Sequence, residues 1–144
     1  MFAAHSSDRL GHTLSLLWLF AILNMLFRDI HEMTMASTIN EILSGYVAGN
    51  LMSEGVLLAG AFAVEILLLA FLLSSLLAPY WSRLLNLALV PVAIVGTFYV
   101  TPSDPDDYFF AFVEVCAFIV IFVLAWRWTP SQQPTEPVGG GHAA

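Results

Sequence analysis

Two glutamates within long apolar stretches are the residues of this sequence best suited to chemistry. Glu65 lies midway along the stretch 51–77, and Glu114 lies within the stretch 108–128. Removal from water disfavours the charged form of a carboxyl group, so a carboxyl in such a place suits the binding of a proton or a cationic ligand. The other reading is structural: a carboxyl group that is kept neutral or is paired with an arginine. The residue types alone leave both readings open.

Three further polar residues accompany these glutamates. Asn24 and Arg28 are four residues apart, so a helix places them on one face, and Glu54 and Glu65 are about three helical turns apart. At ~1.5 Å of rise per residue, Asn24, Glu65 and Glu114 fall in the same half of a membrane. We therefore predict a polar crevice that opens to the non-cytoplasmic side and binds a ligand or a proton. Its residues are Asn24, Arg28, Glu54, Glu65 and Glu114.

We expect Glu65 and Glu114 to face the interior of a helical bundle, with Asn24 or Arg28 within reach of at least one of them. The reason is cost, because a carboxyl group that faces lipid at mid-bilayer lacks a hydrogen-bond partner. Antiparallel packing of their two helices would let the side chains meet across ~6 Å of axial offset.

Other polar or small residues have structural interpretations. Arg83 and Arg127 fit interfacial anchors whose charged ends extend to lipid headgroups. Small residues recur at every fourth position in one stretch and predict close packing against another helix. They are Gly55, Ala59 and Ala63.

A metal site would have to use His31, Glu32 and neighbouring loop carboxylates. No HxxxH or HxxEH spacing supports such a site. We predict no metal site, no cofactor and no catalytic residue.

Composition indicates the elements that must position these groups. Of the 144 residues, 59% are hydrophobic and 10% are charged, whereas a soluble domain is about 25% charged. The chain is therefore predicted to be an integral membrane protein.

The net charge of −7, with only four basic residues, argues against nucleic acid as a partner and against a polybasic lipid-binding segment. The single cysteine, Cys116, excludes an intrachain disulfide.

The apolar stretches predict an all-α, four-helix transmembrane bundle over residues 12–128, with spans at about 12–33, 51–77, 83–100 and 108–128. Residues 1–11 are expected to be a flexible N-terminus, and residues 129–144 a disordered tail. Between the first two spans, residues 38–47 predict a short interfacial helix. Thr38 and Glu41 fit a capping box there, and Gly45 is a candidate end.

Four spans place both termini on one side of the membrane. That side carries Arg9, Arg83 and Arg127, and the other carries Arg28 alone. The positive-inside rule then predicts a multi-pass protein of the cell membrane with both termini in the cytoplasm. A cleaved signal peptide is the alternative for the first stretch, but no A-x-A-type site follows it, so we favour an uncleaved span.

Several segments resemble an uncharacterised family of small bacterial four-span membrane proteins, a domain of unknown function. These segments are LWLFAILNMLFRDI, WSRLLN, and DYFFAFVEV with LAWRW. The resemblance covers roughly residues 13–128 and implies a four-helix bundle in the bacterial inner membrane. It implies no activity, ligand or catalytic residue. DoxX-like proteins are similar in size and span number only.

Three classes of function are compatible with these features. The first is a non-catalytic protein whose crevice binds a hydrophobic or lipid-like ligand or a partner membrane protein. The sequence is also compatible with a homo-oligomer. The second is a small proton- or cation-coupled carrier that uses Glu65 and Glu114, although the sequence has no internal repeat of the kind many transporters carry. A membrane enzyme ranks last, because the sequence has no nucleophile–base pair, metal motif or cofactor signature.

Overall fold

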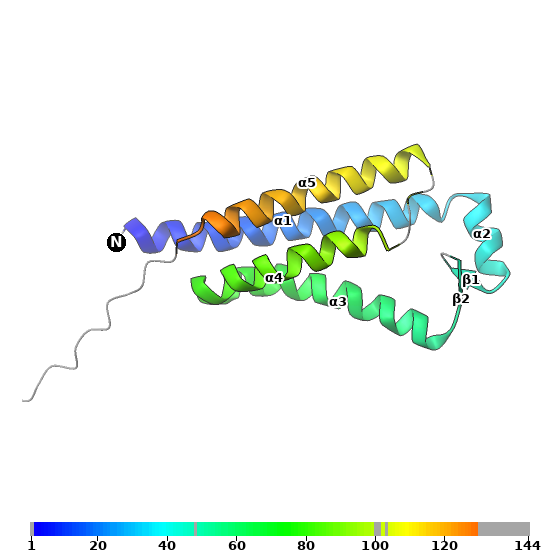
Figure 1. Cartoon of the computed structure of the whole chain (residues 1–144), viewed down its shortest axis with the longest axis horizontal. Helices are drawn as coiled ribbons and strands as arrows, with labels where there is room; N and C mark the ends of the chain where they lie inside the picture. Colours follow the sequence, from blue (N-terminus) through cyan, green and yellow to red (C-terminus); the bar gives the residue numbers. More distant parts are fainter. Residues whose placement is uncertain (1, 48, 100–101, 103, 130–144) are drawn as a thin grey trace, which may run out of the picture.

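Four long helices run alternately in opposite directions in the computed structural model (Figure 1). The structure describes residues 2–47, 49–99, 102 and 104–129, and of residues 2–8 only the backbone. The long helices are α1 (Phe2–Glu32), α3 (Glu54–Leu76), α4 (Pro79–Thr97) and α5 (Pro105–Arg127). Each contains an apolar stretch long enough to cross a membrane. The predicted all-α, four-helix membrane fold is confirmed.

Helix α1 begins at Phe2, well before the predicted start of the first span at residue 12. Its apolar stretch is Arg9–Glu32. The early part of α1 packs closely on the end of α3: a Cβ added to Gly11 would lie 2.8 Å from the backbone oxygen of Ser74. Glycine therefore allows the two backbones to approach here. Most of the predicted C-terminal tail, residues 130–144, lies outside the described residues.

A short helix and a small hairpin connect the first two spans. Helix α2 (Ala36–Leu43) confirms the predicted short helix, which ends earlier than expected because Gly45 adopts a φ of +86°. Strands β1 (Tyr46–Val47) and β2 (Asn50–Leu51) then pair antiparallel. The predicted capping box is wrong, because Met35 is the N-cap and makes no side-chain bond. Glu41 instead accepts a hydrogen bond from the Gly49 backbone N–H at 2.6 Å.

The buried core lies between α1, α4 and α5, with the last turns of α3 beside it. Trp18 and Phe118 meet at its centre with ring centroids 5.5 Å apart. The start of α1 and the end of α5 lie at the same end of the bundle (Figure 1). We call this the termini end, and the end near α2 the hairpin end.

Helix α3 diverges from the bundle toward its first turn (Figure 1). Only 6% of its apolar window is buried, against 28–33% for the other three helices. Its two buried residues, Ala70 and Ser74, lie near its end. The prediction that the small residues pack against another helix is wrong within this chain, because Gly55, Ala59 and Ala63 are exposed. They continue the packed face of α3 into the part of the helix that has separated from α1.

Candidate polar site between α1 and α5

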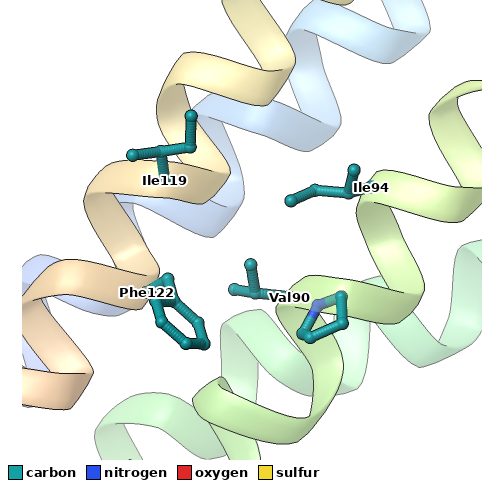
Figure 2. Close-up of a pocket in the computed structure, with 5 residues that line it drawn as sticks. Val90, Ile94, Ile119 and Phe122 are labelled. Atoms are coloured by element: carbon teal, nitrogen blue, oxygen red, sulfur yellow. The ribbon is translucent and has the colours of Figure 1, made fainter.

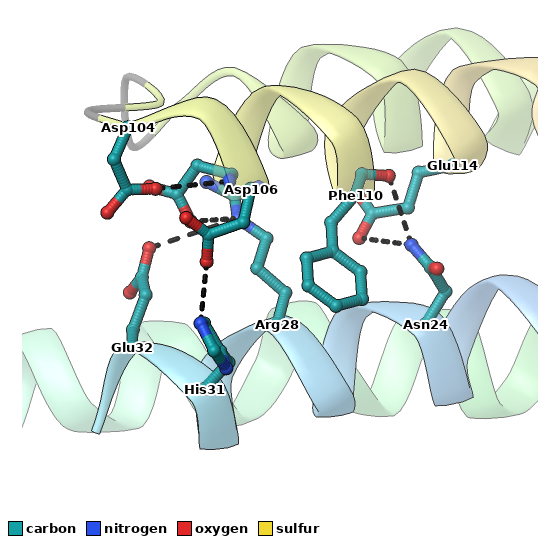
Figure 3. Close-up of polar contacts among 9 residues, drawn as sticks. Asn24, Arg28, His31, Glu32, Asp104, Asp106, Phe110 and Glu114 are labelled. Atoms are coloured by element: carbon teal, nitrogen blue, oxygen red, sulfur yellow. Dashed lines mark hydrogen bonds and ion pairs between the residues drawn. The ribbon is translucent and has the colours of Figure 1, made fainter. Parts of the chain in front are cut away.

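A buried ion pair joins the end of α1 to the start of α5. Arg28 Nε donates a hydrogen bond to Asp107 Oδ1 at 3.4 Å and lies 3.9 Å from Glu32 Oε1 (Figure 3). Arg28 is 6% exposed and Asp107 is 2% exposed. Removing one partner of such a pair is expected to destabilise the protein, because the other is left as an uncompensated buried charge.

Asp107 is a residue that the sequence analysis missed. The loop containing it was expected to end just before a helix at residue 108, whereas α5 begins at Pro105. Asp104 is the N-cap, and its side chain accepts a hydrogen bond from the Asp107 backbone N–H at 3.2 Å. An aspartate followed by proline is a recognisable helix start. That signal would have placed Asp107 in the first turn of α5.

A second contact between the same helices lies nearer the surface. His31 Nε2 is 2.8 Å from Asp106 Oδ2, and both side chains are about half exposed (Figure 3). An exposed pair contributes little, typically ~1 kcal/mol or less. It marks the outer edge of the α1–α5 contact rather than its centre.

Glu114 lies deeper in the bundle, among α1, α4 and α5. Asn24 Nδ2 donates to Glu114 Oε1 at 3.3 Å and to the Phe110 backbone oxygen at 3.0 Å (Figure 3). The Thr97 hydroxyl approaches the same carboxyl group from α4. Glu114 is 1% exposed, and its buried Oε2 has no hydrogen-bond partner within the part of the chain that the structure describes. The prediction that Glu114 faces inward, with Asn24 in reach, is confirmed.

These groups are enclosed by helices rather than lining an open crevice. Arg28, Asp107 and Glu114 are all almost completely buried. An enclosed polar group lowers the free energy of folding only when its hydrogen bonds are made. The arrangement therefore suits the joining of α1 to α5 and the holding of one incompletely satisfied carboxyl group.

The other two predicted site residues lie elsewhere. Glu54 begins α3 and Glu65 lies at its centre, and both side chains are exposed. The described residues offer Glu65 neither a hydrogen bond nor an ion pair. The expectation that Glu65 and Glu114 face a shared interior is therefore wrong for Glu65. Its position is about 140° around α3 from Ala70 and about 180° from Ser74, at ~100° per residue.

A separate hydrogen-bond network occupies the termini end. Trp18 Nε1 donates to Asn86 Oδ1 at 2.6 Å, and Asn86 Nδ2 donates to Ser74 Oγ at 3.0 Å and to the Ser82 backbone oxygen at 2.7 Å. Ser15 Oγ also donates to the Phe71 backbone oxygen. Neutral polar side chains thus connect α1, α3 and α4, as interhelical hydrogen bonds commonly do in membrane bundles.

Groups that would hold a metal ion are absent from the described residues. No cluster of three or more histidine, cysteine, aspartate or glutamate side chains there has the required proximity. His31 and Glu32, the residues considered for such a site, instead contact Asp106 and Arg28 respectively.

Comparison with known proteins identifies the family but no activity. The chain matches the Family of unknown function (DUF6326) over residues 1–135. No curated protein and no solved structure matches it. The chain belongs to this family of unknown function, which confirms the resemblance drawn from the sequence.

Proposed function

We propose that the protein is a non-catalytic membrane protein that works by associating with a second copy of itself through α3. The observation that carries this proposal is the exposure of Glu65 at the middle of α3, the least buried of the four spans. This proposal keeps the binding and assembly class of function and moves the binding surface from the predicted crevice to the outer face of α3.

The residues around Glu65 form a regular seam on that face. Successive spacings of four and three residues place them along one stripe, which is the pattern of a left-handed helix pair. All are exposed. The α3 seam consists of Leu58, Phe62, Glu65, Leu69, Leu72 and Leu76. One polar residue in such a seam can specify the register of the paired helices and how many helices associate.

A second copy of the chain would supply the hydrogen-bond partner that the described residues do not offer Glu65. Burying a carboxyl group in hydrocarbon without a hydrogen bond is costly. A two-fold axis along the membrane normal brings the same residue of two copies to the same depth. The two side chains can then hydrogen-bond to each other instead of facing lipid. The arginines of the chain lie near span ends, so none offers Glu65 a cation at its own depth.

Orientation in the cell membrane is part of the proposal. Arg83 and Arg127 lie at the termini end and Arg28 at the hairpin end, and the positive-inside rule then places the termini in the cytoplasm. Cysteine labelling at Ser131 and Ser103 of a Cys116→Ala protein tests this orientation. A thiol reagent added outside intact cells should label a cysteine at position 103 only. Labelling of position 131 alone would show that the termini lie outside the cell.

Disulfide cross-linking in membranes tests the α3 seam. The background is Cys116→Ala, because Cys116 is exposed and is the only cysteine. Leu69→Cys on the seam should form a cross-linked dimer under oxidation. Val64→Cys is the matched control, since Val64 is similarly exposed but lies about a third of a turn away. Equal cross-linking of the two variants would contradict the proposal.

Substitution of Glu65 measures the contribution of the carboxyl group. Glu65→Leu should weaken dimerisation in bicelles by roughly three- to thirtyfold, the range that one interhelical hydrogen bond supplies in a membrane. Glu65→Gln should retain most of the association, because an amide also donates and accepts. Monomeric wild-type protein at all concentrations, or unchanged dimerisation of Glu65→Leu, would overturn the proposal.

A further inference from the structure

We propose that the seam between α4 and α5 binds an anionic phospholipid, with its phosphate beside Arg83 and an acyl chain in an apolar groove. The site lies in the leaflet at the termini end of the bundle. It uses none of the α3 seam, so it stands independently of the proposed self-association.

The groove lies midway along α4 and α5. It has a volume of about 380 Å³ and an entirely apolar lining, with side chains of the two helices facing each other across it (Figure 2). Pro91 and Ile119 are exposed, so the groove opens on the outer surface of the bundle. A lipid chain is the molecule that surrounds this surface in a membrane. The lining residues are Val90, Pro91, Ile94, Ile119 and Phe122.

Arg83 lies in line with this groove. It precedes Val90 by seven residues and Ile94 by eleven, which places them on one face of α4, ~10–16 Å apart along the axis. The farther distance is about half of the ~30 Å hydrocarbon thickness, so an acyl chain whose phosphate lies beside Arg83 is long enough to reach the groove. Trp126 bridges the two parts: its ring stacks on Phe122 at 6.0 Å, and its backbone oxygen accepts a hydrogen bond from Arg83 Nη2 at 3.3 Å.

Most N–H groups of the Arg83 guanidinium make no hydrogen bond to the described residues. One of its five N–H donors reaches Trp126, and the buried Nε has no acceptor among the described residues. No carboxylate with a described side chain lies at this end of the bundle. Phosphate oxygens provide the acceptors that arginine prefers.

The start of α4 favours the same ligand. Arg83 lies in the early turns of this helix, whose N-cap, Ala78, offers no side-chain oxygen to the free backbone N–H groups. A helix N-terminus attracts negative charge, and basic pockets between membrane helices bind anionic headgroups. A helix of another protein could fill an apolar groove, but it would leave this positive end without an anion. The combination of groove and charge therefore favours the phospholipid.

Native mass spectrometry of the full chain with defined lipids tests the proposal. Phosphatidylglycerol should bind more tightly than phosphatidylcholine of the same chain lengths. Arg83→Gln should remove that preference, a loss of roughly tenfold or more for a hydrogen-bonded ionic contact, whereas Arg83→Lys should keep part of it. Ile119→Trp should fill the groove and weaken both lipids.

Matched variants separate this site from general attraction to a charged surface. Arg127→Gln removes an exposed arginine at the same end, and Val120→Trp enlarges the exposed neighbour of Ile119. Both should bind phosphatidylglycerol as the unmodified protein does. Equal affinity for the two lipids, equal losses in Arg83→Gln and Arg127→Gln, or equal losses in the two tryptophan variants would each overturn the proposal.

Discussion

The two ends of the bundle are held by different interactions, and they differ in whether α3 takes part. At the termini end, neutral hydrogen bonds connect Trp18, Ser74 and Asn86 of three helices. At the hairpin end, the charged pair of Arg28 and Asp107 joins α1 to α5. Among the described residues, no side chain of the other long helices hydrogen-bonds to the first half of α3, and that half diverges.

This difference shows what positions a helix in a membrane. Lipid tails are as apolar as leucine, so apolar surface alone does not hold α3 against its neighbours. Helix α3 packs where Gly11 permits close approach and where Ser74 makes hydrogen bonds. It separates in its first half, although the small residues Gly55, Ala59 and Ala63 lie there. Small residues alone therefore do not close the bundle, and α3 is packed only where interhelical hydrogen bonds accompany the close approach.

The largest effect is expected from breaking the charged contact at the hairpin end. Arg28→Gln leaves the nearly buried Asp107 without its cation, and the free energy of unfolding should fall by about 3–5 kcal/mol. The double variant Arg28→Gln with Asp107→Asn should recover most of the loss, because the buried carboxylate is then removed together with its cation, and Glu32 is partly exposed to solvent. Reversible unfolding in detergent measures both values.

Arg127→Gln is the control for this prediction. Arg127 is exposed at the other end of the same pair of helices. Its removal should change the free energy of unfolding by less than about 0.5 kcal/mol. If Arg28→Gln is as mild as Arg127→Gln, the ion pair does not hold the hairpin end together.

A smaller effect is expected from adding one methyl group to either of two glycines. Gly11→Ala places a Cβ 2.8 Å from the Ser74 backbone oxygen, so α1 and α3 must move apart at a cost of about 1–3 kcal/mol. Gly60→Ala meets nothing within 4 Å and should stabilise α3 by up to about 1 kcal/mol through helix propensity. Thermal unfolding of the two variants should therefore shift in opposite directions. Shifts of the same sign would show that α3 is packed alike at both ends.

The sequence predicted the spans and the depth of their polar residues, because hydropathy and helical rise are properties of each segment alone. The pairing of Asn24 with Glu114 followed from equal depth. Depth does not determine which way a side chain points around its helix. Helix α3 is apolar on every side, so no amphipathic pattern indicated that Glu65 faces outward. The predicted small residues Gly55, Ala59 and Ala63 lie on the same side of α3 as the buried Ala70 and Ser74, but they did not show which part of the helix is packed.

The errors at element ends have a local cause. Thr38 and Glu41 have the spacing of a capping box, but the helix begins two residues before Thr38, and Glu41 binds the Gly49 backbone instead. Asp107 was assigned to a loop because the helix start at Asp104 and Pro105 was not recognised. Tertiary contacts then give both carboxylates roles that spacing alone does not reveal.

The smallest effect is expected at Glu114, the polar group between the two ends. Gln has the same shape and keeps an oxygen that accepts the hydrogen bond from Asn24. It also removes any charge from a side chain that is 1% exposed and has one unsatisfied oxygen. Glu114→Gln should therefore leave the free energy of unfolding within about 1 kcal/mol of the original, or raise it.

A charge-removing variant at an exposed site is the control for Glu114→Gln. Glu54→Gln alters an exposed carboxylate at the hairpin end and should have no measurable effect on the free energy of unfolding. A loss well above 1 kcal/mol in Glu114→Gln alone would mean that attraction between the Glu114 carboxylate and Arg28 helps to close the hairpin end. Stability unchanged in both variants would mean that shape and one hydrogen bond are what Glu114 contributes. In that case the charged contribution to the hairpin end belongs to Arg28 and Asp107.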